Sequence, residues 1–149
     1  MVFKWKPGSH HKVDAQIAGE VCKALEEEGR LTAGDLVEES RPEEAPLHSE
    51  FEWDDSIAAE EFRKQQARVM IATIIEVISP DIVPTRAFFN IVHKESNYES
   101  VRTIIADEDK RKVLLAKALS ELHAFEQKYS TLLELTEVFT AIDNMEVAS

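Results

Sequence analysis

Apolar residues in the first part of the chain recur every three or four positions, which is the spacing of one helix face. They predict a helix over residues 13–28 that Gly29 ends, because glycine readily adopts the left-handed conformation that closes a helix. Thr32 followed by Asp35 is the pattern of a capping box, in which both side chains bind exposed backbone N–H groups. We therefore expect a second, short helix over residues 33–40.

A longer helical pattern follows the proline-containing loop of residues 41–46. Apolar side chains recur over residues 57–78, and the second half of this run is apolar nearly all round, which predicts a central, buried third helix. The residues before it are good N-caps: Asp54, Asp55 and Ser56. Phe51 and Trp53 precede the caps, and we expect them to pack back on the first turn as a hydrophobic staple.

Beyond Pro84 the pattern changes from helical spacing to alternation. Residues 87–92 alternate and are rich in residues that favour strands, and Ser96 with Asn97 marks a turn. Residues 98–105 are expected to return as the second strand of a hairpin, with a helix as the alternative for that segment.

The last part of the chain has a helical pattern from Asp107, a suitable cap, to about Asp143. A seam of apolar side chains alternates at three and four residues, as in a coiled coil. It includes Leu115, Leu122, Phe125, Tyr129, Leu132 and Phe139. Such a helix would be about 50 Å long at 1.5 Å per residue, which exceeds the roughly 30 Å width of a domain of this size. Either it breaks near Ser130 and folds back, or it projects and pairs with another chain; pairing is the favoured alternative.

These elements predict a mainly α protein with a small β-hairpin, in which three N-terminal helices and the hairpin follow a winged-helix-like order. The expected organisation has three parts. Residues 1–11 form a basic, flexible arm, because Pro7-Gly8-Ser9 interrupts regular structure. Residues 12–106 form a helical domain with the hairpin. Residues 107–149 form an amphipathic oligomerisation segment.

Charge limits the classes of partner. The chain of 149 residues has a formal net charge of -12. The first twelve residues carry +3, from Lys4, Lys6 and Lys12, so the remainder carries -15. A chain this acidic repels nucleic acid unless its lysine and arginine residues gather on one face. It is also repelled by anionic membranes. We expect no membrane partner.

Cysteine usage and the chain's first residues indicate the compartment. Cys22 is the only cysteine, so no disulfide forms within the chain, and its place in a helical apolar pattern favours an inert core residue. The first residues lack the apolar region of a signal peptide, and the longest apolar run, residues 69–78, is too short to span a bilayer. We expect a soluble protein of the cytoplasm.

Candidate chemistry gathers around His48. Glu50, Glu52, Asp54 and Asp55 beside this histidine offer a metal site or an acid–base pair. A solvated acidic loop leading into a capped helix explains the same residues, and we favour it because the glycine turn and ligand spacing of calcium loops are missing. No phosphate-binding loop, dinucleotide fingerprint or nucleophile motif occurs in the sequence. We therefore expect no enzymatic activity, no cofactor and no metal.

Nucleic-acid binding is the first alternative function. In a winged-helix arrangement the third helix would enter the major groove and the hairpin would be the wing. The candidate phosphate contacts are Lys4, Lys6, Lys12, Arg63, Lys64, Arg68, Arg86, Lys94 and Arg102. Acidic residues at the start of the third helix oppose this function, and so does the apolar second half of that helix.

One stretch resembles a known group of proteins. The segments PLHSEFEWDD and AAEEFRKQQAR resemble a signature of small uncharacterised proteins encoded by bacteriophages and prophages, and the ending ALSELHAFEQKYSTLLELTEVFTAID is similar to theirs. The matching positions are Pro46, Leu47, His48, Phe51, Trp53, Asp54, Asp55, Ala58, Ala59, Arg63, Gln66, Ala67 and Arg68. The resemblance implies a viral or prophage context in the cytoplasm of a bacterial host, with a place in the virion as the alternative, and implies no mechanism.

The favoured function is a non-enzymatic phage or prophage protein that acts by self-assembly and contact with another protein, as a homodimer or higher oligomer. The alternatives are a winged-helix-like DNA-binding regulator and an acidic mimic of nucleic acid that inhibits a host enzyme. We further expect His48, Trp53, Arg63 and Arg68 to form a polar network that fixes the loop of residues 41–53 onto the third helix, or a docking surface beside it.

Overall fold

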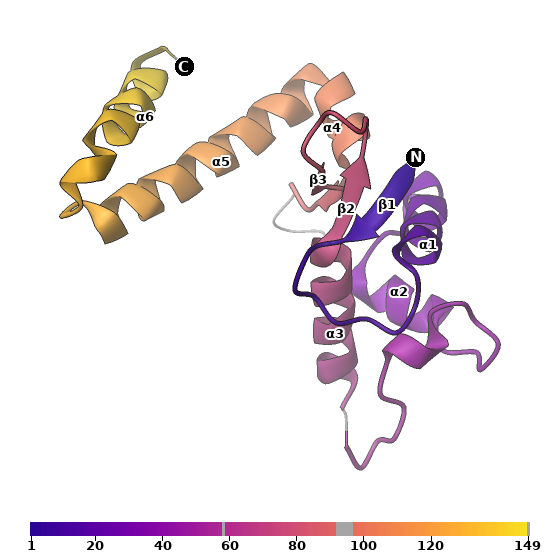
Figure 1. The fold of residues 1–149 in the computed structure, drawn as a ribbon. Helices are drawn as coiled ribbons and strands as arrows, with labels where there is room; N and C mark the ends of the chain where they lie inside the picture. The colour runs from indigo at the N-terminus through magenta and orange to yellow at the C-terminus, as the bar shows by residue number, and fades with distance from the viewer. Residues whose placement is uncertain (58, 92–96, 149) are drawn as a thin grey trace. The chain divides into compact units, whose positions relative to one another are not determined.

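The computed structural model describes residues 1–57, 59–91 and 97–148 (Figure 1). The chain divides into two compact units, residues 1–103 and residues 104–149, and each is described by itself. The fold is mainly helical with small antiparallel sheets, which confirms the predicted fold class. No helix in the described part of the chain is long and apolar enough to cross a membrane.

The first two helices form where the sequence predicts them. Helix α1 spans Ala15–Glu27, and Gly29 follows it with a φ of 70°. Helix α2 spans Ala33–Glu39, and the Thr32 hydroxyl oxygen accepts a hydrogen bond from the Asp35 N–H at 2.9 Å. The capping box is only half formed, because the Asp35 carboxylate accepts from the Thr32 hydroxyl and the Thr32 N–H donates to the Arg30 carbonyl.

The predicted third helix is wrong at both ends. Helix α3 spans Glu60–Thr73, and strand β2, Ile74–Val77, follows it directly. Three of the four residues of β2 are β-branched. Such side chains are already restricted in rotation, so they lose less conformational freedom on forming a strand than other side chains do. Asp54 caps a turn instead of the helix, since its carboxylate accepts from the N–H and hydroxyl of Ser56.

The predicted flexible arm is also wrong, because it contains strand β1, Val2–Trp5. Strand β1 pairs antiparallel with β2, with Phe3 opposite Glu76, and Figure 1 shows the two strands side by side. The order of this sheet is β1-β2-β3, where β3 is Thr85–Arg86. The partner strand lies far along the sequence, which explains why the local pattern of the arm does not reveal it.

The predicted hairpin is present in shortened form. Strand β4, Phe88–Phe89, pairs antiparallel with β5, Glu99–Ser100. After Ser100 the chain enters helix α4, Val101–Ala106, so the helical alternative holds for that part of the segment. Residues 92–96, which include Lys94 and half of the predicted turn, lie outside the described residues.

One hydrophobic core holds the first unit together. It joins β1, the faces of α1, α2 and α3, strand β2 and the start of the second hairpin. Its fully buried side chains include Cys22, Leu31, Leu36, Leu47, Met70, Ile71, Ile74 and Phe88. Burial raises the pKa of the Cys22 thiol to about 12, as expected for an inert core residue.

The second unit is a helical hairpin. Helix α5 spans Glu108–Tyr129 and is capped by Asp107, whose carboxylate accepts from two backbone N–H groups. A 3-10 turn, η2, covers Leu133–Leu135, and helix α6 spans Thr136–Ala148. Of the two alternatives for the long helix, the break near Ser130 is therefore the one that the structure has.

Candidate functional site

The loop of residues 41–53 is held by a network centred on Trp53. The Trp53 indole N–H donates to the His48 carbonyl at 2.8 Å, and the two rings stack with centroids 5.0 Å apart. The guanidinium carbons of Arg41 and Arg63 lie 5.3 and 5.4 Å from the centroid of the Trp53 ring, within the range of cation–π attraction.

Arg63 connects this loop to α3. Its side chain is only 5% exposed, its Nε donates to the Glu52 carbonyl at 2.9 Å, and its other nitrogens bind Asp55 and Glu60. The hydrogen bond to Asp55 raises the pKa of the guanidinium, and burial opposes that rise without cancelling it. The structure thus brings His48, Trp53 and Arg63 together. Arg68 lies exposed on α3.

The candidate phosphate contacts are found in different settings. Arg86 donates to the Phe88 carbonyl and lies over the Phe89 ring, and Lys64 pairs with Glu61. Arg102 pairs with the buried carboxylate of Glu76, with Nε and Oε1 2.5 Å apart. Lys4, Lys6 and Lys12 are exposed, and Lys94 is outside the described residues.

The hairpin that would be the wing of a winged-helix arrangement is not the one predicted from the sequence. The hairpin that directly follows α3 is formed by β2 and β3, and residues 78–84 connect its strands. This connection contains Asp81 and no lysine or arginine. A wing that tracks the phosphate backbone of DNA needs positive charge, so this loop offers it no contact of that kind.

A second network joins three segments that are distant in sequence. His11 lies between Glu50 and Thr73, with Nδ1 3.3 Å from the Glu50 carboxylate and Nε2 2.9 Å from the Thr73 hydroxyl oxygen. The other Glu50 oxygen accepts from the N–H groups of Lys12 and Val13, both at 2.6 Å. The His11 ring stacks on Trp5 at 3.7 Å.

Hydroxyl, imidazole and carboxylate in this order are the parts of a nucleophilic triad. The Thr73 hydroxyl, however, lies 2.9 Å from the Val69 carbonyl and 3.0 Å from that of Met70, so its hydrogen is directed to the main chain of α3. The network fastens the segment after β1 to the end of α3.

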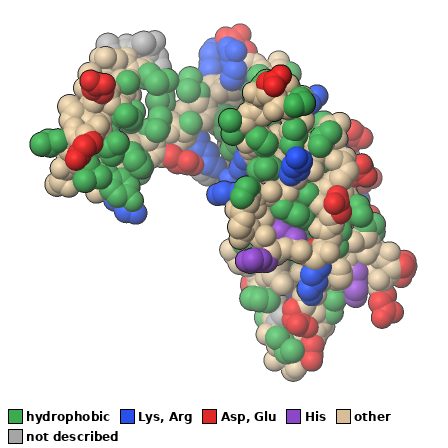
Figure 2. Space-filling view, viewed as in Figure 1, with side chains coloured by type: hydrophobic (Ala, Val, Ile, Leu, Met, Phe, Trp, Pro, Cys, Tyr) green, Lys and Arg blue, Asp and Glu red, His purple; other side chains and the backbone are tan. Residues whose placement is uncertain are grey.

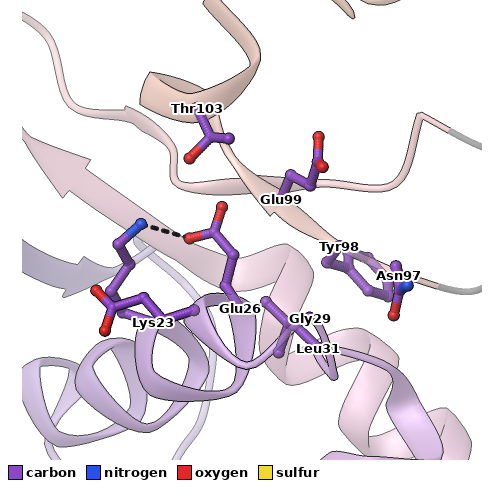
Figure 3. Close-up of a pocket in the computed structure, with 9 residues that line it drawn as sticks. Lys23, Glu26, Gly29, Leu31, Asn97, Tyr98, Glu99 and Thr103 are labelled. Carbon is purple, nitrogen blue, oxygen red and sulfur yellow. Dashed lines mark hydrogen bonds and ion pairs between the residues drawn. The ribbon is translucent and has the colours of Figure 1, made fainter. Parts of the chain in front are cut away.

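A cavity of about 260 Å³ lies beside α1, and Figure 3 shows its lining. Lys23 and Glu26 form an ion pair at 2.6 Å, and the other Glu26 oxygen accepts from the Ser100 N–H at 2.6 Å. Burial favours the neutral form of the Glu26 carboxyl, but hydrogen bonds from Lys23, Ser100 and Thr103 outweigh it and lower its pKa. Glu26 is therefore a carboxylate that ties α1 to β5, with a pKa too low for a general acid near neutral pH.

The second unit exposes much of its apolar seam. Phe125 contacts Tyr129 and Phe139, with ring centroids 4.9 and 6.4 Å away, so part of the seam packs inside the hairpin. The exposed large apolar side chains of α5, η2 and α6 include Val113, Leu115, Leu122, Phe125, Leu132, Leu133, Val138 and Met145. Figure 2 shows hydrophobic side chains gathered on this hairpin.

The hairpin also contains the one set of metal-ligating side chains found among the described residues. His123 and Glu126 on α5 and Asp143 on α6 each place a ligand atom within 4.8 Å of the others. The spacing of His123 and Glu126 on one helix face is visible in the sequence. The third member depends on the fold-back of α6, which the sequence leaves open.

Comparisons with protein-family models, with curated proteins and with solved structures found no match to this chain. The resemblance to phage and prophage proteins therefore stays a prediction.

Proposed function

We propose that this protein is a non-enzymatic assembly protein whose C-terminal hairpin pairs with the hairpin of a second copy. The observation that supports the proposal is the exposed apolar seam of α5, η2 and α6. Several large apolar side chains of this hairpin are exposed, and covering them with a partner would be favourable.

The lengths of the two helices favour a second copy as the partner. Helix α5 has 22 residues and α6 has 13, so at 1.5 Å per residue they are about 33 and 20 Å long. Helix α6 is too short to cover the first third of α5, where Val113 and Leu115 are exposed. An antiparallel copy would bring its own turn, with Leu132 and Leu133, onto this uncovered region and complete a four-helix bundle.

Charge supports the same antiparallel arrangement. The start of α5 carries four basic residues, Lys110, Arg111, Lys112 and Lys117, beside three acids, Asp107, Glu108 and Asp109, so residues 107–117 have a net charge of +1. The turn and the start of α6 carry Glu134 and Glu137. In an antiparallel pair these oppositely charged ends face each other, and such complementarity fixes the orientation of partners more than it adds affinity.

The experiment compares variants by sedimentation velocity. Leu133→Glu places a charge in the apolar turn, and Val83→Glu makes a matched change in the loop between β2 and β3; both side chains are 81% exposed. We expect the wild type and Val83→Glu to sediment as dimers, and Leu133→Glu to shift to monomers without loss of helical circular dichroism. A dimer that persists in both Leu133→Glu and Leu115→Glu would place the interface elsewhere.

A further inference from the structure

The three side chains that meet across the hairpin point to a binding site of their own. His123 and Glu126 are one turn apart on the same face of α5, and Asp143 reaches them from α6. The His123 Nδ1 lies 3.6 Å from a Glu126 oxygen. We propose that these three residues bind a divalent transition-metal ion of the zinc class and so link α5 to α6.

The donor set suits such an ion. Zinc binds imidazole nitrogen and carboxylate oxygen at about 2.0–2.2 Å, so neighbouring ligand atoms around a tetrahedral ion are about 3.4 Å apart. The 3.6 Å between His123 and Glu126 is close to that spacing. All three ligand atoms lie within 4.8 Å of one another, and Asp143 is exposed, so its side chain has room to turn toward an ion.

Electrostatics favour a cation at this position. Two carboxylates held this close repel each other, and the His123 and Glu126 side chains are only 33% and 23% exposed, which weakens screening by water. A divalent ion offsets this repulsion. The competing explanation is that a protonated His123 supplies the positive charge alone, and the two explanations differ in whether metal is taken up.

Metal binding has a structural consequence. The ligands lie near the contact of Phe125 with Phe139, so the ion would fasten the two helices where their rings already meet. Three protein ligands leave one position of a tetrahedral ion open, which a water molecule or a fourth ligand can take. All three ligands belong to one hairpin, so metal binding does not depend on whether two hairpins pair.

The test is calorimetric titration of the chelator-treated, full-length chain with zinc chloride and, separately, manganese chloride. We expect one zinc per chain in the wild type. His123→Ala and Asp143→Asn are expected to weaken binding about 100-fold or more, because loss of even an outer-sphere partner costs 10- to 100-fold. The matched controls are His10→Ala, an exposed histidine of the first unit, and Glu137→Gln, an exposed acid of α6; both should bind as the wild type does.

Melting curves provide the second readout, since zinc should raise the melting temperature of the wild type and leave that of Asp143→Asn unchanged. Two results would overturn the proposal: a wild type that takes up no zinc at millimolar concentration, or binding that His10→Ala removes and His123→Ala does not. In either case the cluster is an ion pair between a histidine and two acids. The sedimentation of the metal-free chain tests the pairing of hairpins separately.

Discussion

At the scale of the residue, the contact between Gly19 and Phe3 explains a glycine in the middle of α1. A Cβ at this position would overlap the Phe3 ring, and that ring is buried in the core where β1 crosses the helix. Glycine normally weakens a helix interior by about 0.5–1 kcal/mol relative to alanine. Here the close approach of strand to helix outweighs that cost.

Gly19→Ala should therefore lower the free energy of unfolding by about 1–2 kcal/mol, since overpacking costs about 1–3 kcal/mol and alanine recovers part of it through helix propensity. The matched control is Gly34→Ala in α2, where the nearest atoms are 3.8 Å away and the substitution should be neutral or stabilising. Urea denaturation of both variants measures the difference, and equal stabilities would contradict the packing described for β1.

The lowered pKa of Glu26 makes a second prediction at this scale. A carboxyl whose pKa is lower in the folded state stabilises the protein at pH values above the ordinary glutamate pKa of 4.5. That stabilisation is lost as the pH falls through the folded-state pKa. The wild type should lose stability over this acidic range, and Glu26→Gln should be less stable near neutral pH and depend less on pH in that range. Melting temperatures from pH 7 down to pH 3 check this, with Glu27→Gln as the exposed neighbouring control.

At the scale of the element, features set by neighbouring residues could be predicted from the sequence, whereas features set by distant residues could not. Gly29, the Thr32 cap and the Asp107 cap act through hydrogen bonds within a few residues, so the sequence alone reveals them. Strand β2 was predicted as helix because its apolar run has no local breaker, and pairing with β1 and β3 favours the strand. The His11–Glu50–Thr73 network joins residues up to 62 positions apart and leaves no spacing signal in the sequence.

The network around Trp53 should be needed to hold the loop of residues 41–53. Arg63→Ala removes a buried charged hydrogen-bond donor, which typically costs about 1.5–3 kcal/mol, and should also speed hydrogen exchange in this loop. Arg68→Ala makes the same substitution at an exposed site on the same helix and should change stability by less than about 0.5 kcal/mol. If the two variants melt and exchange alike, the loop is held by other contacts.

At the scale of the whole molecule, the two units differ in how they bury apolar residues. The first unit has a continuous core that joins helices and sheet, whereas the hairpin of the second unit leaves most of its seam exposed. A pair of helices alone has too little interior to cover such a stripe. The seam was predicted from its spacing, but a projecting helix was favoured over the fold-back that the structure has, because a coiled-coil seam and a hairpin seam have the same periodicity.

The most direct test of self-assembly is the molar mass of the unmodified chain by light scattering on a sizing column, over a range of loading concentrations. Pairing through the hairpin predicts a mass of about 34 kDa, twice the 16.9 kDa of one chain, with monomer appearing only on dilution. A mass of 16.9 kDa at every concentration would contradict the proposed function.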